Sequence, residues 1–323
     1  MHVLLPRIDI PYIPNTKPKK YVSELLLLIK TNNEQDFITW MNWHLFKIGV
    51  DHISIYDNES EIPIERLIKQ YGDHVSYYRV EGRPHQAEIY TKLIAEVSEA
   101  QYVLPIDDDE YIFADINFND YLTSMEPAKL ALHSILMVPE KPLEKRPDKS
   151  VFEICDSLVN ADVRENREVK TVVNTNYSHY YFDVKTYEDG HPSPVYEGIP
   201  DWIDMPMTAD KDLPADRGTD FNFSIAGTVH NPVTKTADGQ YIWAKDMHMQ
   251  DVYGFLSNHP NVPSEIFIAH TKIRSKEEWD WKCKVRKVVA DMKSDYYDSQ
   301  YELYDKVYTY PLAKFTGFKE RYK

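Results

Sequence analysis

Four consecutive acidic residues, Asp107 to Glu110, follow a short apolar run from Tyr102 to Ile106. The apolar run predicts a buried strand, and four like charges at its end repel one another. A divalent cation would relieve that repulsion, because carboxylate oxygens are preferred ligands of hard divalent ions. An acidic loop in open water is the alternative, and this stretch alone leaves both explanations open.

Strand and helix patterns alternate from residue 23 to this acidic cluster. Apolar runs predict strands at 23–30, 51–56, 75–80 and 102–106, and helical spacing predicts helices at 34–47, 63–71 and 85–100. This alternation predicts an α/β fold, in which a mostly parallel, doubly wound sheet carries helices on both faces. Ligands of such sheets bind beyond the carboxyl ends of the strands.

Polar side chains follow all four predicted strands. They are Thr31 and Glu34 after the first strand, Asp57 after the second, Arg83 after the third, and Asp107 and Asp109 after the fourth. Because the carboxyl ends of parallel strands meet at one edge of a sheet, we expect these side chains to converge. Strand ends are often polar, but several acceptors, one arginine and a tight acidic group are more than solvation requires.

The pattern changes after the acidic cluster. A helix is predicted at 117–124, strands at 129–138, 151–155, 168–173 and 266–270, and an exposed loop at 140–150. Ser275 and Glu278 have the capping-box spacing that starts a last helix. His44 lies on the apolar stripe of the first helix, so we expect it to be a packing residue.

Composition narrows the function. The 323 residues have a formal net charge of −15, which argues against binding to nucleic acid or to anionic membranes. Two cysteines form no disulfide framework. The start of the chain lacks a signal-peptide pattern, and no apolar run is long enough to span a bilayer. We therefore expect a cytoplasmic protein with no transmembrane segment.

Residues 23–113 resemble glycosyltransferases of the GT-A fold, especially the family ninety-two and family-two-like group. Three segments carry the resemblance: the Lys-Thr-Asn-Asn-Glu opening at 30–34 with its continuation to Val50, the Tyr-Asp-Asn-Glu-Ser turn at 56–60, and the Asp-x-Asp (DxD) run at 106–112. A fourth, at 266–279, resembles the late His and Ser-x-Glu-Glu element of the same group. Thr39 and Tyr111 depart from the residues usual there, and neither is part of the implied chemistry.

The resemblance implies a role for each candidate residue. Thr31 and Asp57 would face the nucleobase of a sugar donor, with Glu34 and Arg83 nearby. Asp107 would meet the ribose, or the metal through water, and Asp109 would bind Mn²⁺ or Mg²⁺ directly. His270 would return to the same ion, since imidazole is an acceptable Mn²⁺ ligand, and Lys272 and Arg274 would lie beside the diphosphate. Asp108 would point away, and Glu110 has no assigned role.

The acceptor side is less defined. In the related group a strand lysine and a following histidine lie near the acceptor, and Lys170 and His179 match them here. An inverting enzyme also needs a carboxylate base on the acceptor hydroxyl. The candidates in the irregular 180–264 region are Glu197, Asp201, Asp216 and Asp220. We select Asp220, which precedes the apolar segment 221–225.

These features predict a metal-dependent glycosyltransferase that moves a sugar from a nucleotide-diphosphate sugar, with UDP favoured, to a hydroxyl of a glycan or glycoconjugate. The expected organisation is an extended lead-in at 1–22, a catalytic domain at 23–274 with a donor half (23–125) and an acceptor half (126–274), and a helical extension at 275–323. A haloacid-dehalogenase-like phosphatase is one alternative, although Tyr111 stands where that motif needs Thr or Val. A non-catalytic glycan- or nucleotide-binding module is the other.

Overall fold

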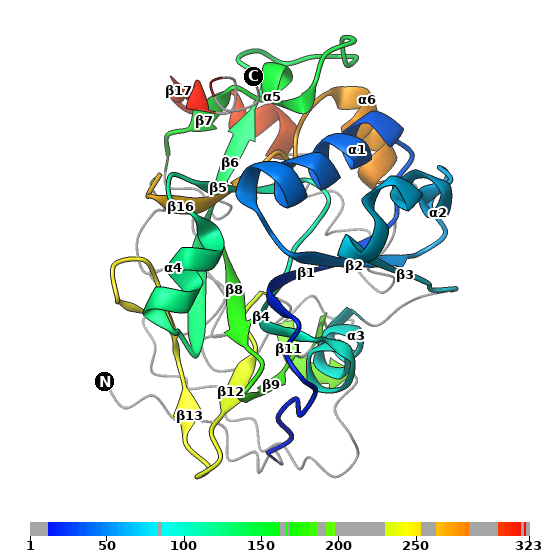
Figure 1. The fold of residues 1–323 in the computed structure, drawn as a ribbon. Coiled ribbons are helices and arrows are strands. Elements are labelled where there is room, and N and C mark those ends of the chain that lie inside the picture. The colour runs from blue at the N-terminus through cyan, green and yellow to red at the C-terminus, as the bar shows by residue number, and fades with distance from the viewer. Residues whose placement is uncertain are drawn as a thin grey trace.

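A computed structural model describes residues 12–82, 86–161, 166, 168–181, 183–186, 192–197, 230–252, 263–283, 303–317 and 320. Its centre is a twisted sheet with helices packed against it (Figure 1). The predicted α/β fold is confirmed. None of the helices in these ranges has the length and apolar character needed to cross a bilayer.

The first half of the sheet is parallel. It contains β1 (Tyr21–Ile29), β2 (His52–Asp57), β3 (Val75–Arg79) and β4 (Ala100–Pro105), in the spatial order β3-β2-β1-β4. Ile29 is paired with Asp57 and Asp57 with Arg79, so three strands end at one level. The chain passes from β1 to β2 on one side and later enters β4 on the other side of β1. The gap between the ends of β1 and β4 is therefore the topological switch point, where ligands of open α/β sheets bind.

Both faces of this sheet are covered, as the apolar run at 25–29 of β1 requires. Leu25 and Leu27 pack in a cluster with residues of α1 (Glu34–Asn42), its π-helical continuation η1 (Trp43–Ile48), α2 (Ile64–Leu67) and η2 (Ile68–His74). Leu26 and Leu28 pack on the opposite face, with α3 (Gln86–Lys92) and η3 (Leu93–Val97). Figure 1 shows α1 and α2 on one side of β1 and α3 on the other.

The first helix begins and ends where its sequence indicates. The side chain of Asn33 accepts the backbone N–H of Asp36, and Glu34 adds a second acidic residue to the first turn. Gly49 ends η1 with φ 81°, a left-handed conformation that glycine adopts without strain. The Asn33 cap fixes the segment that connects β1 to α1, which lies beside the switch point.

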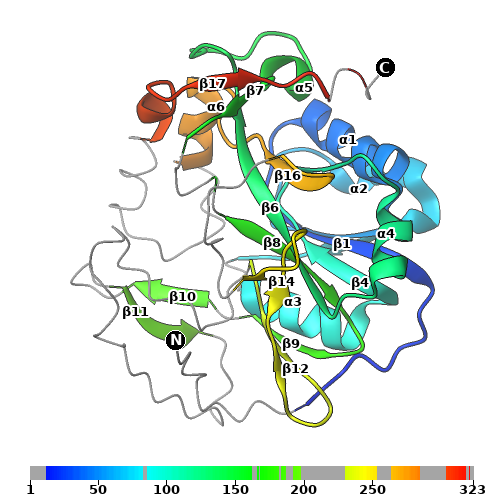
Figure 2. The same ribbon diagram turned by 90° about the vertical axis from the view of Figure 1, so that its left-hand side faces the viewer.

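The second half of the sheet is mixed. The long strand β6 (Lys129–Val138) pairs antiparallel with β8 (Val169–Asn174), which in turn pairs antiparallel with β4. The strand β5 (Glu110–Ala114) pairs antiparallel with β16 (Ile266–His270), and β16 runs parallel to β6. Figure 2 shows β16 beside β6, although the two strands are far apart in sequence. Residues after the acidic cluster thus come back to it from β8 and β16.

Shorter elements complete the described chain. They are α4 (Phe118–Met125), β9 (Ser178–Tyr180), β10 (Asp183–Thr186), β11 (Pro192–Glu197), β12 (Val233–Lys235), β13 (Tyr241–Ile242), β14 (Ala244–Lys245) and β15 (Asp251–Val252). The strand β12 lies between β9 and β13, and β14 joins β6. These pairings connect residues 230–252 to the sheet.

The prediction of a strand at 151–155 is wrong, because this segment forms the helix α5 (Val151–Ile154). Ser150 and Glu153 form a capping box in which each side chain meets the backbone of the other. The run 151–155 is too short for the spacing of its apolar residues to distinguish a helix from a strand. The capping box therefore favours the helix.

The described C-terminal residues contain helices and a strand that was not predicted. The helix α6 (Lys276–Trp281) starts at the Ser275 cap, and residues 303–307 are also helical. The strand β17 (Leu312–Lys314) pairs antiparallel with β7 (Ser157–Val159), next to α5 and α6 (Figure 2). This pairing anchors residues 312–314 to the body of the molecule.

Two fully buried histidines are neutral in the fold. The Nδ1 of His44 lies 2.9 Å from the Trp40 carbonyl oxygen, and its Nε2 accepts the backbone N–H of Ile112, as expected for a packing residue. The ring of His179 lies between the Asn174 carbonyl oxygen and the Thr234 hydroxyl. Burial lowers the pKa of each imidazole to about 3.

These histidines are expected to weaken the fold in acid. Between pH 6.5 and about 3 the unfolded chain binds protons at both imidazoles and the folded chain does not. The free energy of unfolding should therefore fall as the pH is lowered, by up to about 1.4 kcal/mol per pH unit for each histidine. Denaturant unfolding at several pH values should show that the free energy of unfolding falls less steeply with decreasing pH in His44→Gln than in wild type. The same substitution at the exposed His248 is the control, and equal slopes in all three proteins would contradict the assignment.

Candidate functional site

The acidic cluster forms a tight turn between β4 and β5. The indole N–H of Trp40 donates to the carbonyl oxygens of Asp107 (3.2 Å) and Glu110 (2.8 Å), which ties the turn to α1. The side chain of Asp107 is 30% exposed, whereas those of Asp109 and Glu110 are buried. The turn therefore leaves Asp107 and Asp108 partly exposed and holds Asp109 and Glu110 inside the protein.

Lys170 on β8 joins two of these carboxylates. Its ammonium group lies 2.8 Å from Asp107 Oδ2 and 3.2 Å from Glu110 Oε2, with only 2% of its side chain exposed. The same Glu110 oxygen accepts the backbone N–H of Asp107 at 3.0 Å. Glu110, to which the sequence assigned no role, thus holds the backbone of Asp107 and shares Lys170 with its side chain.

Burial and charge act in opposite directions on this pair. Burial raises the pKa of Glu110, and the nearby Lys170 ammonium opposes the shift. Burial also disfavours the charged form of Lys170, but Asp107 and Glu110 outweigh it and raise the pKa of the lysine. The two carboxylates therefore favour the charged form of Lys170.

His270 reaches the site through β16. It is paired with Glu110 in the antiparallel ladder, and its Nε2 lies 3.6 Å from Asp109 Oδ1. Within the described residues its buried Nδ1 has no hydrogen-bond partner. The backbone N–H and the hydroxyl of Thr271 both donate to the Asp109 carbonyl oxygen, at 2.7 and 3.0 Å. The structure therefore brings together Asp109 and His270, which are 161 residues apart in the sequence.

A second lysine meets Asp109. Lys282, at the C-terminal end of α6, forms an ion pair with Asp109 Oδ2. Sequence reasoning did not single out this residue, because nothing in its local pattern distinguishes it from a solvated helix lysine. The two outer carboxylates of the DxD run, Asp107 and Asp109, are thus each paired with a lysine from a distant element.

The donor set suits a divalent ion that is shared with a ligand. Asp109 offers carboxylate oxygen and His270 imidazole nitrogen, a combination that Mn²⁺ accepts. No cluster of three or more His, Cys, Asp or Glu residues suited to hold a metal occurs among the described residues. An ion here would therefore complete its coordination with water and phosphate oxygens, as Mg²⁺ usually does. The Lys282 ammonium has to leave Asp109 Oδ2 for that oxygen to bind metal.

Thr31 and Asp57 lie close together at the ends of β1 and β2, and Ser60 connects them. The backbone N–H of Thr31 donates to the Ser60 hydroxyl at 3.0 Å, and the Ser60 N–H donates to Asp57 Oδ1 at 2.9 Å. Tyr77 donates to the other Asp57 oxygen at 2.8 Å. Asp57 is buried, and these hydrogen bonds hold its carboxylate in the turn after β2. Glu34 is exposed in the first turn of α1.

The two cations after His270 differ in their surroundings. The Lys272 ammonium lies 5.9 Å from the ring centre of Trp279. The Arg274 guanidinium forms an ion pair with Asp36 and donates to the Thr271 carbonyl oxygen at 3.1 Å. Arg274 is thus paired with a buried carboxylate on α1, and its place beside a diphosphate stays a prediction.

Asp36 also binds Arg146, whose second nitrogen lies 2.7 Å from Asp36 Oδ1. Burial favours the neutral form of Asp36, but Arg274 and Arg146 outweigh this effect and lower its pKa. Arg146 reaches Glu278 at 3.1 Å as well. This network fastens α1, the 140–150 loop and the start of α6 around the segment that carries His270.

Two predicted site residues, Arg83 and Asp220, lie outside the described residues, as do the alternative bases Asp201 and Asp216. Glu197 ends β11, and its side chain is not described. Their roles remain predictions.

Comparison with known proteins gives limited similarity. No family model matches the chain, and no curated protein matches it. One similar solved structure is GalNAc-T7 with UDP, GalNAc and Mn²⁺, at 12% identity and a TM-score of 0.29, over 36% of this chain and 24% of that chain. Another is S. aureus TarS, at 10% identity and a TM-score of 0.29, over 48% of this chain and 28% of that chain. Similarity this low carries no weight for function, which we derive from the chain's own residues.

Proposed function

We propose that this protein is a GT-A-type, metal-dependent glycosyltransferase that uses a nucleotide-diphosphate sugar, with UDP favoured. The observation that carries the proposal is the meeting of Asp109 and His270 beside Asp107 at the end of β4. That position is the switch point of a sheet ordered β3-β2-β1-β4. The order of the motifs along the chain, from the 30–50 segment to the late His270 segment, supports the same class.

The residues divide into two groups. Asp109 and His270 would hold Mn²⁺ or Mg²⁺, with Asp107 acting on the ribose or through water. The bound ion would supply positive charge to the departing diphosphate. On the other side of the switch point, Thr31, Glu34, Asp57 and Arg83 would receive the nucleoside.

The cations near the site have distinct proposed roles. Lys272 and Lys282 are on the segment that follows His270, and either ammonium can attract a diphosphate by charge alone. Arg274 would act through position, because its pairing with Asp36 holds the 271–274 segment against α1. Arg274 is therefore proposed as a donor-site residue that positions this segment.

The acceptor would be a hydroxyl of a glycan or glycoconjugate, and transfer would invert the anomeric centre. A carboxylate base must then take the proton of the attacking hydroxyl. We propose Asp220 for this role, from the segment that precedes 221–225. Replacing Asp220 separates the roles, because it should reduce transfer and leave donor binding intact.

A nucleotide screen tests the proposed class. UDP with Mn²⁺ is expected to raise the unfolding temperature, since a ligand at about one hundred times its Kd stabilises the folded state by about 2.7 kcal/mol. UDP with EDTA should have a much smaller effect, and GDP and ADP with Mn²⁺ test the choice of base. Release of UDP from UDP-sugars then distinguishes an enzyme from a binding module.

Two results of that screen would contradict the proposal. If no nucleoside diphosphate stabilises the protein with either Mn²⁺ or Mg²⁺, the switch point does not bind a donor. If the protein releases inorganic phosphate from small phosphomonoesters and ignores nucleotide sugars, the DxD run serves phosphatase chemistry instead.

A further inference from the structure

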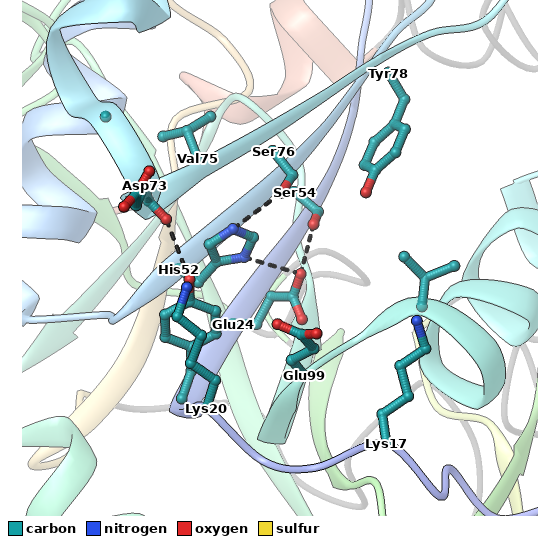
Figure 3. Close-up of a pocket in the computed structure, with 13 residues that line it drawn as sticks. Lys17, Lys20, Glu24, His52, Ser54, Asp73, Val75, Ser76, Tyr78 and Glu99 are labelled. Atoms are coloured by element: carbon teal, nitrogen blue, oxygen red, sulfur yellow. Dashed lines mark hydrogen bonds and ion pairs between the residues drawn. The ribbon is translucent and has the colours of Figure 1, made fainter.

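A second polar constellation lies at the opposite end of the same parallel strands. Glu24 on β1 and His52 on β2 are paired in register, and Ser76 lies on the next strand, β3 (Figure 3). Glu24 Oε1 lies 3.2 Å from His52 Nδ1, and His52 Nε2 lies 3.1 Å from the Ser76 hydroxyl. The three side chains form a continuous chain from carboxylate to imidazole to hydroxyl.

The hydrogen bonds around Glu24 determine where the protons are. Its carboxylate is 3% exposed and accepts the Ser54 hydroxyl at 2.5 Å and the Ser98 hydroxyl at its other oxygen. A carboxylate that only accepts requires His52 to donate from Nδ1. In the neutral imidazole Nε2 is then the acceptor, and the Ser76 hydroxyl can donate to it. This is the protonation pattern in which a histidine can take the proton of a serine nucleophile.

The imidazole is held in place. The ring of Tyr21 stacks on His52 with centroids 4.6 Å apart and planes 13° from parallel. His52 is buried, and Ser76 is partly exposed. Stacking on one side and the Glu24 bond at Nδ1 therefore fix the direction of Nε2.

Ser76 and His52 line a pocket of about 480 Å³. Tyr78, Lys20 and Glu99 also line this pocket (Figure 3). Hydroxyls, an imidazole and charges of both signs make the lining polar. A pocket of this size and polarity suits a short acyl group on a small polar alcohol, and not a long fatty acyl chain.

The backbone N–H of Tyr77, the residue after Ser76, points away from β2. The N–H of Val80 bonds to the Asp57 carbonyl oxygen on β2 at 2.9 Å. Because N–H directions alternate along a strand, the N–H of Ser76 also faces β2, and that of Tyr77 faces the other way. Among the described strands β3 pairs only with β2, so this side of β3 is an open sheet edge. The N–H that follows a nucleophile can stabilise the oxyanion of an acyl intermediate.

We propose that Ser76, His52 and Glu24 form a serine-nucleophile site that hydrolyses small carboxylic esters. The Ser76 oxygen attacks the ester carbonyl carbon while His52 Nε2 takes the hydroxyl proton. The bond to the alcohol breaks, and the alcohol leaves with the proton from His52. Water, activated by the same nitrogen, then releases the acid and regenerates the serine. Glu24 is a positioning residue that keeps the proton on Nδ1.

A fluorophosphonate probe tests the nucleophile, because the serine oxygen displaces fluoride and forms a stable bond to phosphorus. Mass spectrometry of the labelled wild-type protein should locate the adduct on Ser76, and Ser76→Ala should lack it. His52→Gln should slow labelling by about one hundredfold, the lower range for loss of a general base. Ser124→Ala is the control. Its hydroxyl is exposed on α4, outside the residues that line the pocket, so labelling should match that of wild type.

Short ester turnover gives the second measurement. Wild-type protein should hydrolyse p-nitrophenyl acetate, and Ser76→Ala should lose the part of the rate that the probe inhibits. Asp109→Ala should retain full labelling, because the two sites lie at opposite ends of the strands. The proposal is wrong if folded wild-type protein forms no Ser76 adduct, if His52→Gln is labelled as fast as wild type, or if Ser76 is labelled but no short ester is turned over.

Discussion

Replacing Asp109 with alanine is expected to abolish metal-dependent donor binding and to reduce sugar transfer by at least about a thousandfold. The carboxylate is one of two protein donors that the geometry offers to a divalent ion, and a metal contributes several kcal/mol to the stabilisation of developing charge. Each 1.36 kcal/mol is a factor of ten in rate. The fold should survive, because Lys282 is partly exposed and its ammonium can turn to water.

Three measurements separate the steps in this variant. Mn²⁺ binding followed by electron paramagnetic resonance reports the ion, calorimetry with UDP reports the donor, and UDP release reports turnover. Asp108→Ala is the matched control, since Asp108 is the neighbouring carboxylate that has no proposed role, and it should stay within tenfold of wild type. Unchanged UDP affinity in the presence of Mn²⁺ for Asp109→Ala would show that the metal site is assigned to the wrong residue.

The parallel half of the fold could be predicted because its signals are local. The strand β1 is apolar on both faces, so it had to lie between two layers of helices, and Asn33 and Gly49 mark the ends of the first helical segment. The order of strands and helices then implies that Thr31, Asp57 and Asp107 follow strands that end on one edge. Only periodicity, caps and the general behaviour of α/β sheets were needed for this step.

The partners of the acidic residues could not be predicted in the same way. Lys170 reaches Glu110 because β8 lies antiparallel beside β4, and Lys282 reaches Asp109 because α6 follows β16. Neither contact leaves a local pattern. A lysine in the otherwise apolar strand 169–173 was the one available signal, because a buried ammonium needs a carboxylate partner.

Arg274 is paired with Asp36, a contact that its position in the sequence did not predict. The sequence places this arginine four residues after His270, so a position beside the same ligand was expected. It gives no indication that Asp36, in the first turn of a distant helix, would be buried against it. An acidic residue in the first turn suits the helix dipole, which accounts for the position of Asp36 in the helix but not for its burial.

The Glu24 constellation was missed for a related reason. Glu24 lies in a segment whose overall apolar character predicts a buried strand, and the single charge did not change that prediction. In the structure the residue is paired with His52 and satisfied by two serine hydroxyls from separate elements. A charged residue inside an apolar strand is therefore informative at two places in this chain, Glu24 and Lys170.

Replacing Lys170 with methionine is expected to lower the free energy of unfolding by about 3–5 kcal/mol, the cost of leaving a buried charge without its partner. Glu110 is 1% exposed and would lose the cation that opposes the effect of burial on its pKa. It would then stay protonated in the folded state to a higher pH than in the unfolded state. The variant should therefore be more stable at low pH and lose that stability as the pH rises through the folded-state pKa of Glu110.

The double variant Lys170→Met/Glu110→Gln isolates the charge. Glutamine keeps an oxygen that can accept the Asp107 N–H and removes the buried carboxylate. Denaturant unfolding near neutral pH should show that the double variant regains most of the stability lost in Lys170→Met. The interaction energy from the double-mutant cycle should be more than about 1 kcal/mol. Asp107 would still lack its lysine, so donor affinity should remain below that of wild type in a folded protein. If Lys170→Met is as stable as wild type at every pH, Lys170 is not the cation that allows Glu110 to be buried, and Asp107 must be held in some other way.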